Sequence, residues 1–203
     1  MRGLMVTSSR PETLDVTEIA RRPLQVEDCA LVIIDIQERL LPHMFNREEV
    51  ARNAPLLARL ANILEVPVLI TTQYAKGLGP TIPELCALLP GARHLDKLEF
   101  NAFSDAGVCA AAKALPGKRN TLLLTGMEAH VCVMQSALGA LNQGYIVHVA
   151  SDCIASRVEW NWRIAQERMR AAGCIISSTE MIMYELLGRS GTPEFKEILK
   201  YVK

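Results

Sequence analysis

Three side chains of the sequence, those of Asp35, Lys97 and Cys132, could together perform acyl transfer. A thiol attacks a carbonyl carbon as its thiolate, and an unperturbed cysteine with a pKa of about 8.5 is mostly protonated at neutral pH. A carboxylate can take the thiol proton and later return it to the leaving group, while a nearby ammonium group stabilises the anion. These residue types therefore indicate nucleophilic catalysis by Cys132, with Asp35 as the base and Lys97 as the cation.

The thiol lies in the stretch TGMEAHVC, residues 125–132, between an apolar run and a segment with helical periodicity. Backbone N–H groups at the start of a helix favour an anion. The turn before the cysteine can also direct N–H groups toward a developing oxyanion. The sequence therefore predicts that Cys132 is an activated thiol at the point where a strand ends and a helix begins.

The elements that must position these residues alternate between strands and helices, which predicts an α/β protein with three α/β/α layers around a six-stranded parallel sheet. Short apolar runs predict strands at 30–35, 67–73, 93–98, 120–126, 145–151 and 173–178. Helices are expected at 47–65, 105–115, 130–143, 157–172, 179–188 and 192–202, and a Gly/Pro-rich loop leads into a short helix within 75–85.

In such a sheet, ligands bind beyond the carboxyl ends of the strands. Asp35 follows the first predicted strand, Gln73 ends the second, and Lys97 lies near the end of the third. Taken singly, each residue has an ordinary structural interpretation: an aspartate caps a loop, a lysine is solvated, and a cysteine fills the core. Their coincidence at equivalent strand ends favours a single site.

Length and composition indicate one globular domain. Of the 203 residues, 50% are hydrophobic, and we expect an N-terminal arm at 1–28 and a hydrolase domain at 29–203. The 22 Lys and Arg residues balance the 22 Asp and Glu residues, so no net charge attracts nucleic acid or an anionic membrane. Six scattered cysteines, no apolar leader and no apolar stretch of membrane-spanning length predict a cytoplasmic protein.

Cofactor signals are absent from the sequence. No CxxC or Cys/His cluster has zinc spacing, so we expect no metal. No GxGxxG follows the first predicted strand, which argues against a dinucleotide-dependent oxidoreductase. We therefore expect catalysis without a cofactor.

Three segments, ALVIIDIQERL, KLEFNAF and TGMEAHVCVMQSALGALNQGYIVHVASDCIASR, resemble the isochorismatase-like cysteine hydrolase family over residues 28–190. The loop GLGPTIPEL and the tail TPEFKEILKYVK resemble its branch of isochorismatase domain-containing proteins. The resemblance implies a Rossmann-like isochorismatase fold and a triad of Asp35, Lys97 and Cys132. It also implies a cis peptide bond between Met127 and Glu128, and an oxyanion hole formed by the N–H groups of Glu128 and Cys132.

The departures from the family pattern narrow the chemistry. Nicotinamidase-like members carry a metal-binding Asp and nearby His residues after the second strand, where this chain has Gln73 and no histidine, so we expect neither that metal site nor pyridine amides as substrates. Members that cleave a vinyl ether do not need the nucleophile, whereas this chain retains Cys132, which favours C–N or ester hydrolysis. Glu128 stands where many amidases have a small residue, and it either narrows or charges the pocket.

The sequence thus predicts a hydrolase of small molecules, with Gln73, Tyr74 and Phe103 as candidates for the pocket wall. A homo-oligomer is expected, and the segment MIMYELL with Trp160 and Trp162 could belong either to its interface or to the core. The alternative is a non-catalytic family member that serves as a binding or scaffold protein.

Overall fold

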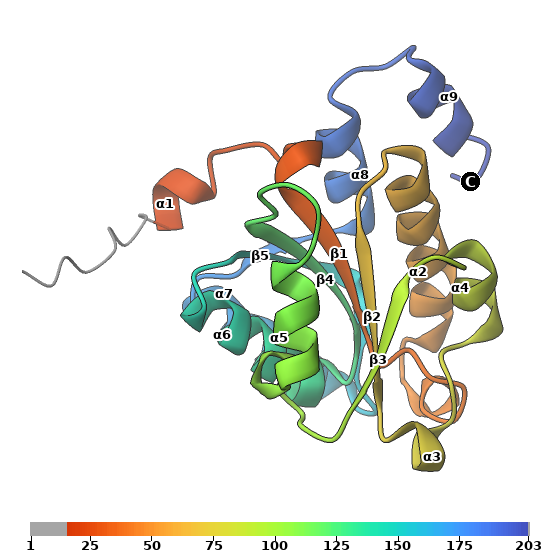
Figure 1. Ribbon diagram of the computed structural model, residues 1–203, viewed down its shortest axis with the longest axis vertical. Coiled ribbons are helices and arrows are strands. Elements are labelled where there is room, and N and C mark those ends of the chain that lie inside the picture. The colour runs from red at the N-terminus through yellow and green to blue at the C-terminus, as the bar shows by residue number, and fades with distance from the viewer. Residues whose placement is uncertain (1–15, 203) are drawn as a thin grey trace, which may run out of the picture.

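The computed structural model describes residues 16–202, so most of the expected arm, residues 1–15, lies outside the described residues. A six-stranded parallel sheet forms the middle of three layers, as the alternating pattern predicted (Figure 1). The strands are β1 (Cys29–Ile34), β2 (Val68–Gln73), β3 (Arg93–Lys97), β4 (Thr121–Met127), β5 (Ile146–Ala155) and β6 (Ile175–Ser177).

The strand order is β3-β2-β1-β4-β5-β6. The chain runs outward from β1 to β3 and then returns to place β4 on the other side of β1, so the order reverses between β1 and β4. A crevice at the carboxyl ends of the strands opens at such a reversal, and ligands bind there. Asp35 follows β1, and Cys132 follows β4 after five residues, so both lie at this point.

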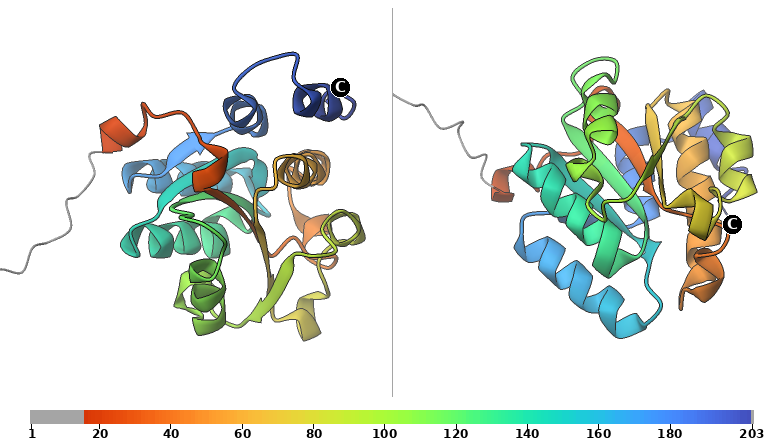
Figure 2. Two further views of the ribbon diagram at one scale, coloured as in Figure 1. Left: turned by 45° about the horizontal axis from the view of Figure 1, so that its top comes forward. Right: turned by 60° about the horizontal axis from the view of Figure 1, so that its bottom comes forward.

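Helices cover both faces of the sheet (Figure 2). Alternate residues of β1 enter two separate cores: Leu31 and Ile33 face α2, α4, α8 and α9, while Val32 and Ile34 face α5, α6 and α7. A strand that is buried on both faces reads as a continuous apolar run, as CALVII does. The helices are α1 (Val16–Ile19), α2 (Arg47–Ile63), α3 (Ala75–Leu78), α4 (Pro83–Leu88), α5 (Ala106–Lys113), α6 (Met134–Asn142), α7 (Glu159–Ala171), α8 (Thr179–Leu187) and α9 (Pro193–Ile198).

The described end of the arm is attached to the domain. The Leu24 N–H donates to Glu185 Oε2 of α8 over 3.1 Å, and the Leu24 side chain is buried. Arg119, just before β4, donates to the carbonyl oxygens of Val26 and Cys29. The residues nearest β1 therefore pack on this chain's own sheet and helices, and the boundary at residue 28 stays a prediction.

Gly126 allows β4 to approach β1 closely beside the candidate site. Its φ is +133°, and a Cβ built at this position would lie 1.9 Å from the carbonyl oxygen of Ile34. No side chain fits there, and an L-residue disfavours that φ in any case. The glycine therefore sets the spacing between the strand that precedes Asp35 and the strand that precedes Cys132.

We expect Gly126→Ala to lower the free energy of unfolding by about 3 kcal/mol or more, because the new Cβ collides with backbone. Gly91→Ala is the matched control, since its Cβ would meet nothing within 4 Å; a change within about 0.5 kcal/mol is expected there. Urea denaturation of both variants checks this. Equal stabilities would show that β4 moves away from β1 without cost.

Candidate active site

A buried ion pair joins two of the sequence-predicted residues. Lys97 Nζ lies 2.7 Å from Asp35 Oδ2, and both side chains are 0% exposed. Thr71 Oγ1 donates to the other carboxylate oxygen, Oδ1, over 2.7 Å. Two buried charges are tolerated only when they are paired and their remaining hydrogen-bonding positions are filled. The three residues come from the ends of β1, β2 and β3, so the convergence expected at the carboxyl edge is present.

Gln73 completes the surroundings of the lysine. Its Oε1 accepts from Lys97 Nζ over 2.8 Å, and its Nε2 donates to the carbonyl oxygen of Leu98 over 2.8 Å. Gln37, which sequence reasoning missed, holds the backbone of Gln73 through two bonds: its Oε1 accepts from the Gln73 N–H at 2.8 Å, and its Nε2 donates to the Gln73 carbonyl at 3.1 Å. The only signal of this role in the sequence was that Gln37 lies two residues after Asp35, the candidate base.

Cys132 lies in a π-helical turn, Ala129–Val133, that precedes α6. The helix predicted at 130–143 is therefore confirmed to within one residue at each end, and its first turn is π-helical because the Glu128 carbonyl accepts from the Val133 N–H over 3.2 Å. The Met127–Glu128 peptide bond is cis. The Cys132 sulfur lies 3.9 Å from Gln73 Oε1 and is thus next to the ion pair.

The surroundings of the thiol keep it protonated in the resting site. Burial, and next the charge of Asp35, raise the pKa of Cys132 to about 12, while Lys97 and a backbone hydrogen bond from Glu128 act in the opposite direction. The expectation of an activated resting thiol is therefore wrong, because a thiolate would add a second anion beside the carboxylate in a buried site.

The other two candidates for the pocket wall, Tyr74 and Phe103, lie in different surroundings. The N–H of Tyr74 donates to the Lys97 carbonyl over 3.0 Å, and its half-exposed ring lies against Gly77 of α3, on the rim of the site. Phe103 is 4% exposed, and its ring centroid lies 5.7 Å from that of Tyr145, beyond the C-terminal end of α6. The ring of Phe103 thus packs in the apolar core that also contains Cys132, and its role in the pocket wall stays a prediction.

The side chain of Glu128 has a partner that the sequence did not reveal. Its Oε2 accepts from Arg157 Nε over 2.9 Å and from the Arg157 backbone N–H over 3.2 Å. The Glu128 side chain is 11% exposed and the arginine side chain 62%. Arg157, which follows β5, therefore compensates the charge of the Glu128 carboxylate, and whether the side chain of Glu128 narrows the pocket stays a prediction.

No described part of the site is a metal centre. His130 Nδ1 lies 3.0 Å from Ser156 Oγ, and its Nε2 lies 3.4 Å from Asn161 Nδ2, so the imidazole links the π-helical turn to β5 and α7. Within residues 16–202, His, Cys, Asp and Glu side chains form no group of three or more that could hold a metal ion. The same described residues include no helix with the length and apolarity that a bilayer crossing requires.

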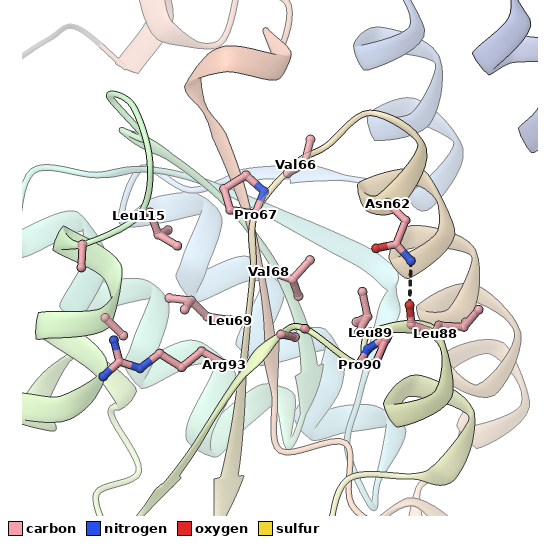
Figure 3. Close-up of a pocket in the computed structure, with 14 residues that line it drawn as sticks. Asn62, Val66, Pro67, Val68, Leu69, Leu88, Leu89, Pro90, Arg93 and Leu115 are labelled. Carbon is pink, nitrogen blue, oxygen red and sulfur yellow. Dashed lines mark hydrogen bonds between the residues drawn. The ribbon is translucent and has the colours of Figure 1, made fainter.

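A cavity of about 570 Å³ lies elsewhere on the sheet (Figure 3). Val68 and Arg93 begin β2 and β3 and line it, together with Leu115 near the end of α5 and Asn62, whose Nδ2 donates to the Leu88 carbonyl over 2.7 Å. These residues lie at the amino edge, opposite to Gln73 and Lys97, so the cavity belongs to a different part of the molecule from the candidate site.

Comparisons with known proteins identify relatives over most of the chain. The family described as the isochorismatase domain matches residues 29–181. The secreted isochorismatase effector Isc1 of Phytophthora sojae is 36% identical over 176 residues, which are 85% of this chain and 83% of that protein. Isochorismatase domain-containing protein 2 of Macaca fascicularis is 35% identical over 173 residues, 85% of this chain and 82% of that protein.

Solved structures share the same fold. The MAR1 ribonuclease of Caenorhabditis elegans is 32% identical with a TM-score of 0.83, covering 89% of this chain and 92% of that one. YcaC of Pseudomonas aeruginosa, solved with hexane-2,5-diol and covalent acrylamide, is 28% identical with a TM-score of 0.83 over 89% and 92% of the two chains. YcaC of Escherichia coli, described as an octameric hydrolase of unknown specificity, is 26% identical with a TM-score of 0.83 over 88% and 90%.

We expect Asp35→Asn to increase the rate at which iodoacetamide alkylates Cys132 at pH 8. The carboxylate raises the pKa of the thiol, so its removal lowers that pKa, and each unit increases the thiolate fraction about tenfold. Peptide mass spectrometry measures the rate, and Cys153 and Cys174, both buried, should stay unreactive if the fold is intact. An unchanged rate would show that Asp35 does not control the thiol proton, whereas a slower one would show that its action as a base outweighs its effect on the thiol pKa.

Proposed function

This chain belongs to the isochorismatase family, and on that premise we propose that it is a cysteine hydrolase that cleaves an amide-type C–N bond or an ester bond of a small molecule. The observation that carries the proposal is the placement of a thiol beside a buried carboxylate–ammonium pair, at a turn just before a helix. Nucleophile, base, cation and oxyanion donor are the parts that covalent acyl transfer requires.

The proposed reaction begins with proton transfer from Cys132 to Asp35. The thiolate attacks the substrate carbonyl, and the N–H groups of Glu128 and Cys132 bind the oxyanion. Protonated Asp35 then gives its proton to the departing amine or alcohol as the C–N or C–O bond breaks, which leaves a thioester on the cysteine. Water attacks the thioester with Asp35 as base, and the thiol regains its proton as the acid product leaves.

Lys97 remains charged throughout this cycle and stays bound to Asp35 and Gln73. Its charge stabilises the thiolate after the proton has moved, when the carboxyl group is neutral. A thiol that is protonated at rest suits this sequence, because the first step is the transfer of its proton to Asp35. The reaction as written uses only the chain's own residues, so we propose that it needs no metal ion or cofactor.

Two findings on relatives support this assignment. The P. aeruginosa relative carries covalent acrylamide, an electrophile that nucleophilic side chains attack. The E. coli relative is described as a hydrolase. The nematode relative is described as a ribonuclease, so a substrate screen must include RNA. The balance of 22 basic and 22 acidic residues in this chain gives no net attraction for RNA.

We further propose that the protein works in the cytoplasm as a homo-oligomer. All six cysteines are free thiols, as expected in a reducing compartment. The relative described as an octamer shares the fold, and Trp160 and Leu98 expose 67% and 69% of their surface here. Exposed large apolar side chains of this kind are typical of surfaces that associate.

Cys132→Ser should reduce hydrolysis of neutral amides and esters by at least about a thousandfold, because a serine hydroxyl has no comparable acidity in this site. The measurement is kcat/KM on a panel of small carboxamides and p-nitrophenyl acetate, with RNA as a separate arm. Cys174→Ser, which changes a buried cysteine elsewhere in the core, is the control and should retain activity. Equal rates in the two variants would contradict the mechanism.

Light scattering of the purified protein should give a mass of at least two chains. Trp160→Lys is expected to reduce that mass, because it places a charge on a surface proposed to be covered. Its melting temperature should fall little, since the side chain is exposed. A monomer in the unsubstituted protein would contradict the proposed assembly.

A further inference from the structure

We propose that the ion pair between Glu128 and Arg157 makes the active site selective for substrates that are uncharged next to the scissile bond. The inference rests on the proposed function, because it concerns the substrate class of the same site. It assigns to Arg157 a role in specificity through charge compensation, and it assigns to the Glu128 side chain a role distinct from that of its backbone N–H.

The geometry shows a carboxylate engaged by one arginine at two points. Both the guanidinium Nε and the backbone N–H of Arg157 donate to the same oxygen, Oε2 of Glu128. The shared oxygen joins the segment after β4 to the segment after β5. Because the glutamate side chain is 11% exposed, this pair is largely shielded from solvent on the carboxylate side.

The pair lies close to the reacting atom. Glu128 directly precedes the π-helical turn that contains Cys132, and its carbonyl accepts from the N–H groups of Val131 and Val133, the two neighbours of Cys132. The carboxylate of Glu128 lies within about 5 Å of its own Cα. A charge at this range acts strongly on a charged group bound at the thiol, because a partly buried site screens it less than bulk water does.

The formal charges of the described site residues sum to zero. The site contains two carboxylates, Asp35 and Glu128, and two cations, Lys97 and Arg157, and each carboxylate is matched by one cation in direct contact. No cation among these four is left to balance an anionic substrate group, and no carboxylate is left to balance a cationic one. A neutral amide or ester therefore meets the smallest electrostatic barrier.

The Arg157 guanidinium nonetheless has N–H donors that do not contact Glu128. Only Nε and the backbone N–H contact Glu128, and the Arg157 side chain is 62% exposed. If the carboxylate were neutralised without a change of shape, the guanidinium of Arg157 would lose its anionic partner and remain beside the residue that precedes the turn of Cys132. The state of Glu128 thus decides whether the site accepts neutral or anionic molecules.

Iodoacetamide and iodoacetate test this directly, since the two reagents share a leaving group and a reaction and differ by one negative charge. The measured quantity is the ratio of the iodoacetate rate to the iodoacetamide rate at Cys132, read by peptide mass spectrometry on the full chain. The same ratio at Cys109, a partly exposed cysteine of α5, normalises for reagent differences. The kcat/KM values for p-nitrophenyl acetate and mono-p-nitrophenyl succinate provide the same comparison in turnover.

The expected ratios follow the charge count. Glu128→Gln should raise the ratio about tenfold, and Arg157→Gln should lower it about tenfold. The double variant Glu128→Gln/Arg157→Gln is neutral again and should return to within about twofold of the unsubstituted protein. Arg157→Lys keeps the charge and should also stay near that value. Arg59→Gln, at an arginine over the ring of Tyr201, is the matched control and should change nothing.

The outcomes separate the two proposals. If Cys132 reacts in every variant and the ratio stays constant while overall rates fall, the pair has only a structural role and the inference is overturned. If neither reagent labels Cys132 and Cys132→Ser hydrolyses the ester panel as fast as the unsubstituted protein, the proposed function itself is overturned. If Glu128→Gln and Arg157→Gln fail to fold, the unsubstituted protein decides the matter: a kcat/KM for p-nitrophenyl acetate about tenfold above that for mono-p-nitrophenyl succinate supports the inference, and equal values overturn it.

Discussion

The buried ion pair between Asp35 and Lys97 is the interaction on which the arrangement of the site depends. Removing two charges from water costs about several kcal/mol for each ion. Hydrogen bonds from Thr71 to Asp35 and from Lys97 to Gln73 offset part of this cost. The need for these partners fixes the ends of three strands relative to one another: Ile34 pairs with Thr71, and Gln73 pairs with Lys97 in the parallel register. A shift of one residue between these strands would leave a charge buried without its partner.

The second constraint is steric and lies on the other side of β1. Gly126 lets β4 approach the carbonyl of Ile34 within a distance that excludes any side chain. The turn that follows then brings the thiol of Cys132 to the edge that already holds the carboxylate. Polar pairing on one side of β1 and close backbone contact on the other thus bring together groups that are nearly 100 residues apart in sequence.

Electrostatic balance connects the site to its proposed chemistry. Burial first, and next the charge of the adjacent carboxylate, raise the pKa of the Cys132 thiol, so the resting thiol stays protonated. A second carboxylate, that of Glu128, is matched by an arginine from the next strand. Within this arrangement a proton can move from sulfur to carboxylate without a change in the total charge, and a neutral substrate can enter without adding one.

The sequence by itself determined the alternation of strands and helices and the placement of Asp35, Gln73 and Lys97 at strand ends, because strands buried on both faces read as continuous apolar runs. Only the tertiary structure decided the partner of Glu128, the protonation of the thiol and the burial of Phe103 in the core. Each of these depends on distances between residues far apart in the chain, and on the exclusion of water around them. Local apolar patterns record which segments are buried, but contacts and desolvation between segments arise only when the fold brings them together.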